Sequence, residues 1–198
     1  AYEADMRHLI DTYIEASGPR KISPFENSSL LELIVKSGIA DAITAKLDHL
    51  KLKDSAVEEV IANNVRSKIV KERMNDPAFF DRMSDLLEEV IAARKAKAIE
   101  YEEYLKRIAN LAVQVQNGQA SDTPKTLNTP GLRALFNNLG KIEGLAQTVH
   151  NRVREVRPDD WRGVQARELV IKRALYEVLN DETEVERIFL IVKAQREY

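Results

Sequence analysis

The most chemically distinctive stretch of the sequence is RPDDWRG (157–163), which contains the only tryptophan of the chain, Trp161. Arginines are frequent around it: Arg152, Arg154, Arg157 and Arg162. Guanidinium groups bind phosphate oxygens and carboxylates well, because their donors match the geometry of both. We therefore expect Arg152, Arg154, Arg157, Trp161 and Arg162 to be candidate contacts to a protein partner or to DNA.

Acidic neighbours favour the protein partner over DNA. Glu155, Asp159 and Asp160 lie among the arginines and can pair with them locally. A DNA-binding surface needs an uncompensated positive field, whereas protein interfaces favour tryptophan and arginine. The formal net charge of the whole chain is −2, so a strongly basic character is also lacking. Direct contact with duplex DNA through these arginines stays as the alternative.

Two partial catalytic motifs occur in the sequence, and neither is complete. Pro158-Asp159 matches the first half of a PD-(D/E)xK nuclease motif, but no acidic residue precedes a lysine by two positions anywhere in the chain. Gly140-Lys141 lacks the spacing and the following Ser or Thr of a Walker A loop. We therefore predict no catalytic residue and no cofactor-binding residue in this stretch of chain.

Metal ligands are also sparse. The sequence has no cysteine, which excludes thiolate nucleophiles and cysteine-ligated zinc or iron–sulfur clusters. Asp5, His8 and Asp11 would share one helix face, yet no second histidine supports them, and a solvated surface explains the spacing. His150 has no accompanying serine and aspartate that would make it a general base. We predict no metal site.

The rest of the chain consists of segments with helical periodicity. Apolar residues recur at i, i+3 and i+4 in about 2–17, in 80–91 and most regularly in 101–115. Helix starts are predicted at Ser28 or Ser29, at Asp54 or Ser55, at Asp76-Pro77 and at Thr129-Pro130. Gly38 is expected to end the first of these helices in the left-handed conformation. One of Asp159 and Asp160 is expected to cap the helix over 165–179, with Trp161 as an anchor.

These segments predict an all-α fold of about eight to ten helices in two packed lobes. The first lobe is expected over residues 1–116 and the second over 130–198. The intervening residues 117–129 are polar and interrupted by glycine and proline, which predicts a linker or an exposed loop. No apolar run approaches the roughly 18 residues of a membrane span, and no signal peptide is recognisable. We expect a cytoplasmic protein, and the opening at Ala1 in helical periodicity suggests a piece of a longer chain.

Several long phrases resemble one known family. They are NDPAFFDRMSDLLEEVIAARKAKAIEYEEYLKRIANLA (75–112), RPDDWRG (157–163) and IKRALYEVLNDETEVERIFLIVKAQREY (171–198), together with RKISPFENSSLLELIVKSGI and NNVRSKIVKERMNDPAFF. They are similar to the carboxy-terminal helical region of the R subunit, the restriction and motor subunit, of type I restriction-modification enzymes. The resemblance extends along nearly the whole chain.

The resemblance implies a place in an ATP-dependent DNA translocase and endonuclease. In that family the nuclease domain and two motor domains precede the helical region. The parent chain would then be a type I site-specific deoxyribonuclease that uses ATP and Mg²⁺. This helical region would hold the motor subunit on the modification (methyltransferase) and specificity subunits, and would itself carry no catalytic site. Its alternative role would be to guide duplex DNA by contacts to the backbone.

Overall fold

The structure is a computed structural model that describes residues 29–198. This part of the chain contains nine α-helices, one short 3₁₀ helix and no strand, which confirms the all-α prediction. The predicted helix over about 2–17, and Asp5, His8 and Asp11 with it, lie outside the described residues.

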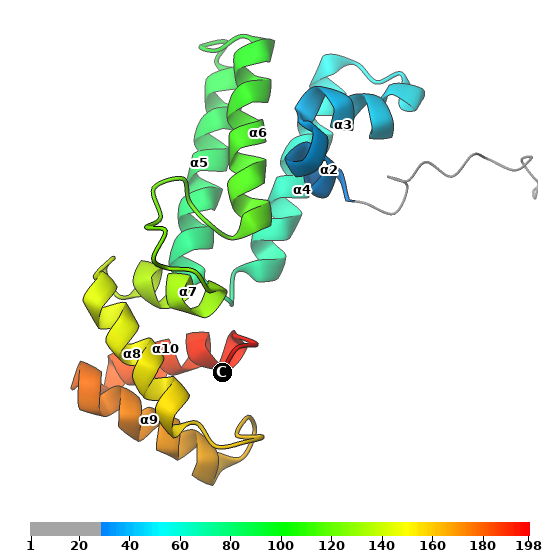
Figure 1. Ribbon diagram of the computed structural model, residues 1–198. Coiled ribbons are helices and arrows are strands. Elements are labelled where there is room, and N and C mark those ends of the chain that lie inside the picture. The colour runs from blue at the N-terminus through cyan, green and yellow to red at the C-terminus, as the bar shows by residue number, and fades with distance from the viewer. Residues whose placement is uncertain (1–28) are drawn as a thin grey trace, which may run out of the picture.

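The first lobe contains the helices α2 to α6. Their bounds are α2 (Leu30–Ser37), α3 (Ile39–Lys46), η1 (Asp48–Leu50), α4 (Asp54–Glu72), α5 (Pro77–Lys95) and α6 (Tyr101–Asn117). The three long helices α4, α5 and α6 pack against one another, and α2 packs on α6 (Figure 1). Helix α6 extends to Asn117, which the sequence placed in the following loop.

The second lobe lies beyond the ends of α5 and α6 and contains four helices. They are α7 (Pro130–Asn138), α8 (Glu143–Val156), α9 (Gln165–Leu179) and α10 (Glu182–Ala194). Helix α8 packs between α7 and α9, and α10 contacts both α9 and α7. Helix α7 also packs on α5, so it joins the two lobes (Figure 1).

Several predicted helix starts are confirmed by their hydrogen bonds. Ser29 makes a reciprocal capping box with Glu32, Asp76 accepts from the Phe79 backbone N–H, and Thr129 accepts from the Leu132 N–H. These side chains satisfy donors that the first helical turn leaves without partners.

One predicted helix start and the predicted backbone conformation at one helix end differ from the structure. Helix α4 begins at Asp54 itself, after Lys53 in extended conformation, so neither Asp54 nor Ser55 is its cap. Asp54 instead lies in the first turn, where a negative charge favours the helix dipole. Gly38 ends α2 as predicted, but at φ 88° and ψ 167° rather than in the left-handed helical conformation.

The buried apolar side chains form two separate clusters. One lies within α2 to α6 and reaches Ala120, and the other begins at Leu127 and includes α7 to α10. This division agrees with two packed lobes. The loop between them contributes one buried residue to each cluster, so it is held by both cores.

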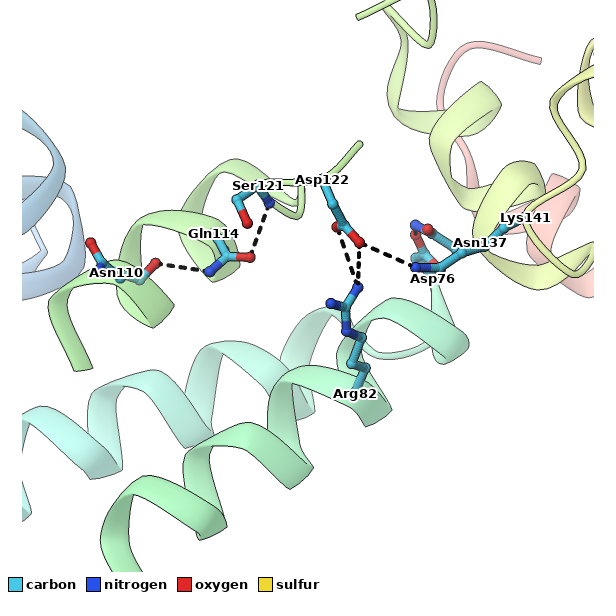
Figure 2. A network of polar contacts seen from close by, with 8 residues as sticks. All are labelled: Asp76, Arg82, Asn110, Gln114, Ser121, Asp122, Asn137 and Lys141. Carbon is cyan, nitrogen blue, oxygen red and sulfur yellow. Dashed lines mark hydrogen bonds and ion pairs between the residues drawn. The ribbon is translucent and has the colours of Figure 1, made fainter. Parts of the chain in front are cut away.

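Polar contacts also fix this loop. The Ser121 backbone N–H donates to the side chain of Gln114 on α6, and Asp122 lies between Arg82 of α5 and Lys141 after α7 (Figure 2). The ion pairs are half exposed and long, at 3.4 and 3.5 Å, so each contributes little to stability. Their position shows that the loop passes across the junction between the lobes.

None of the helices in the described part of the chain combines the length and the apolar character needed to cross a bilayer.

Candidate functional site

The segment RPDDWRG connects α8 to α9, and the structure places its tryptophan in the core. The side chain of Trp161 is 2% exposed and its ring lies 5.9 Å from the ring of Phe189 on α10, measured between centroids. Burial confirms the predicted anchor. It also removes the Trp161 side chain from the surface, so Trp161 packs the second lobe and is not an external contact in this structure.

Arg162 fixes the same loop to the end of α10. Its guanidinium lies 4.5 Å from the centre of the Trp161 ring. The Arg162 Nε donates to the Lys193 carbonyl at 3.0 Å, and another guanidinium nitrogen donates to the Gln195 carbonyl. The last carbonyls of a helix lack partners within it and carry negative partial charge, which a cation satisfies. Arg162 therefore has a structural role.

We predict that Arg162→Ala lowers the free energy of unfolding by about 1 kcal/mol, because it removes the cation–π contact and two hydrogen bonds at the surface. Arg157→Ala is the matched control. The Arg157 side chain is exposed, so the change should stay within about 0.5 kcal/mol. Urea unfolding of the two variants measures the difference, and equal effects would contradict this role for Arg162.

Arg152 pairs with two glutamates. It bonds to Glu177 on α9 through Nε at 3.0 Å and Nη2 at 2.6 Å, and to Glu155 on its own helix at 3.0 Å. The hydrogen bond with Glu177, followed by that with Glu155, raises the pKa of Arg152 above its usual value. Arg152 thus links α8 to α9, and two carboxylates already compensate its charge.

Arg154 and Arg157 are the remaining members of the predicted group. Both side chains are exposed. Within residues 29–198 neither makes a hydrogen bond or an ion pair. Of the five predicted contact residues, these two are the exposed arginines whose guanidinium groups have no hydrogen-bond or ion-pair partner among residues 29–198.

The aspartates of the loop do not cap α9, contrary to the prediction. The residue before α9 is Val164, which has no capping side chain. The backbone carbonyls of Asp159 and Asp160 instead accept from Arg167, at 2.8 and 3.3 Å. The Glu168 carboxylate accepts from the Gly163 backbone N–H at 2.7 Å and so reaches back from the first turn. The loop before α9 is therefore held by Arg167 and Glu168, two side chains of α9 itself.

His150 lies in a buried polar contact with the end of the described chain. Its Nδ1 is 2.7 Å from the Tyr198 hydroxyl and 3.6 Å from the Glu197 carboxylate. Burial lowers the pKa of His150, and the nearby Glu197 opposes that effect. The contact packs the residues after α10 against α8. Among the described residues, no group of three or more His, Asp or Glu side chains could hold a metal ion.

An exposed apolar surface on α9 was not predicted. It consists of Leu169, Val170, Arg173 and Tyr176, which share one side of the helix, and we call it the α9 surface. Leu169 is 44% exposed and Tyr176 45%. The opposite side of α9 carries Ile171 and Leu175, which are buried in the core.

A groove of about 520 Å³ follows the α9 surface toward α10. Leu169 and Tyr176 line it together with Val185 of α10. Lys172 in this groove pairs with Glu186, whereas Arg173 makes no ion pair in the described part of the chain. The groove therefore combines apolar walls with two charged side chains that have no ion-pair partner among the described residues, the cation Arg173 and the carboxylate Glu182.

The sequence does indicate this surface, although the prediction of a helix over 165–179 did not include it. The stretch ELVIKRALYEVL has too many apolar residues for one stripe facing a single core. A helix that is apolar on two sides must bury the second side against something else or expose it.

Comparisons of the chain with protein families, with characterised proteins and with solved structures found no match.

Proposed function

We propose that the chain is an assembly module, the carboxy-terminal helical region of a type I restriction R subunit. It docks the motor subunit on the modification and specificity subunits in the cytoplasm. ATP and Mg²⁺ would be used by other domains of the parent chain, and this region would contribute no catalytic step. The sequence resemblance is the reason for proposing this family, and the observation that supports a docking role is the α9 surface.

The chemistry of the α9 surface suits a protein partner. Exposed apolar side chains gain free energy when a complementary surface removes them from water, by roughly 25 cal/mol for each Å² buried. Tyr176 adds a rigid aromatic group of the kind enriched at interface centres, and Arg173 adds a cation. The partner should therefore present an apolar ridge beside a carboxylate.

The test is capture of the modification and specificity subunits by the R subunit with a Leu169→Glu/Tyr176→Glu pair. We expect the two new charges to weaken capture at least tenfold, because they would be buried without partners in the complex. The matched control is Val70→Glu on α4, where the side chain is 70% exposed and lies outside this surface.

Circular dichroism should show that both proteins keep their helical content and melting temperature. Full capture by the Leu169→Glu/Tyr176→Glu protein, or an equal loss in Val70→Glu, would contradict docking through the α9 surface.

Duplex-DNA guidance is the second candidate, and the exposed Arg154 and Arg157 favour it. Two phosphate contacts give a shallow salt dependence, since log K falls with log salt by roughly 0.9 per neutralised phosphate. Binding of a short duplex that weakens with salt, and that weakens less steeply in Arg154→Ala/Arg157→Ala, would support guidance. Absence of binding at low salt would exclude it.

A further inference from the structure

The two lobes meet through a polar junction. Their apolar side chains form separate clusters, and the contact between lobes is made where the turn before α5 meets α7. Apolar clusters resist changes in packing because they are dense, whereas a polar junction can exchange its hydrogen bonds for water. The junction is therefore the place where the relative position of the lobes can change at the lowest cost.

Asp76 lies at the centre of this junction. The residue is 6% exposed. One carboxylate oxygen, Oδ1, accepts from the Phe79 backbone N–H at 3.2 Å and from Asn138 Nδ2 at 2.8 Å. The other, Oδ2, accepts from Asn137 Nδ2 at 2.7 Å. One carboxylate thus caps a helix of the first lobe and holds two side chains of the second.

Further hydrogen bonds cross the junction close by. The Ala78 backbone N–H donates to Asn138 Oδ1 at 3.3 Å, and Gln195 Nε2 donates to the Asn75 carbonyl at 2.5 Å. A cavity of about 810 Å³ opens beside them, lined by residues of both lobes. Solvent can therefore reach the junction with a small movement.

Charged groups from three segments line this cavity beside Asp76. They are Glu72 of α4, Arg133 of α7, and Arg196 and Glu197 after α10. Arg187 of α10 approaches the junction from another side and donates to the Asn138 carbonyl at 2.7 Å. In the cavity Glu72 and Glu197 offset Arg133 and Arg196, and Arg187 is already paired with Glu184. These groups therefore do not cancel the cost of burying a carboxylate.

We propose that Asp76, Asn137 and Asn138 form a proton-sensitive joint, whose closed arrangement takes up a proton on Asp76 and whose opened arrangement releases it. Opening would move α7 away from the turn before α5 and expose the Asp76 carboxyl to water. The proton passes only between this carboxyl and solvent.

The direction of the pH dependence follows from the burial of the Asp76 carboxyl. Burial raises the pKa of Asp76 to about 6, and it outweighs the hydrogen bonds from Asn137, Phe79 and Asn138 and the charge of Arg133, which all lower it. An exposed aspartate has a pKa of about 3.9. The closed joint is therefore most stable below about pH 4, and it weakens as pH rises to 6.

The test measures hydrogen exchange of the full chain by mass spectrometry, in peptides that cover 76–80 and 134–139. After correction for intrinsic exchange, the opening constant of the wild-type protein should rise roughly tenfold between pH 5 and pH 7.5. Both peptides should change together, because one movement exposes them. In Asp76→Asn the opening constant should not depend on pH in this range.

Two further variants complete the experiment. Asp85→Asn removes an exposed carboxylate from the same helix and should keep the wild-type dependence. Asn137→Ala removes one hydrogen bond to Asp76 and should shift the midpoint to higher pH, which tests the joint even if Asp76→Asn does not fold. Three results would overturn the proposal. They are a wild-type opening constant that does not depend on pH, the wild-type pH dependence retained in Asp76→Asn, and an unshifted midpoint in Asn137→Ala.

Discussion

Replacing Trp161 with alanine should lower the free energy of unfolding by about 3–5 kcal/mol, which is among the largest effects that one substitution can have. The ring is buried between the loop after α8 and helix α10, where it contacts Phe189. Alanine leaves a cavity there, and Arg162 loses the aromatic face over which it lies. Urea unfolding at neutral pH measures the change.

Trp161→Phe is the matched control. Phenylalanine keeps an aromatic ring, and it loses no hydrogen bond, since the Trp161 Nε1 is buried and has no partner among the described residues. We expect a cost of about 1 kcal/mol, mainly from the smaller volume. Equal costs for phenylalanine and alanine would show that the ring is not what stabilises the second lobe.

The helices and their starts were largely predictable from local sequence. Asp76-Pro77 and Thr129-Pro130 combine a capping oxygen with a residue that needs no N–H bond, and both begin helices in the structure. The regular apolar spacing of 101–115 likewise became α6. Such features depend on neighbours within four residues, so the sequence alone contains them.

The roles of the arginines could not be predicted in the same way. Arg162 bonds to the Lys193 carbonyl, and Arg152 bonds to Glu177 on another helix. Sequence proximity instead suggested pairing with Glu155, Asp159 and Asp160, of which only Glu155 pairs with Arg152. A long side chain reaches whichever acceptor the packing of helices brings near, and that packing is a property of the whole lobe.

Asp76 makes one contact that could be predicted from the sequence and two that could not. Its capping bond to the Phe79 N–H is local and was predicted. Its bonds to Asn137 and Asn138 join residues that are 61 and 62 positions away. No local pattern indicates that α7 will lie against the start of α5, so the junction between the lobes was visible only in the structure.

Asn138→Ala should be the most damaging change at that junction, with a cost of about 3 kcal/mol at pH 8. Asn138 is buried, and its amide donates to Asp76 and to the Ala134 carbonyl while it accepts from the Ala78 N–H. Alanine removes all three bonds and leaves a buried carboxylate with fewer donors. Asn110→Ala on the exposed side of α6 is the control and should stay within about 0.5 kcal/mol.

The pH dependence of this cost separates it from a simple loss of packing. The hydrogen bond from Asn138 lowers the pKa of Asp76, so its removal should raise that pKa above 6. A raised pKa favours the folded protein when Asp76 is protonated and disfavours it when Asp76 is ionised. The cost of Asn138→Ala should therefore be smaller at pH 5 than at pH 8. Urea unfolding at both values tests this difference, and a cost that is equal at the two would mean that Asn138 acts through packing and not through the Asp76 charge.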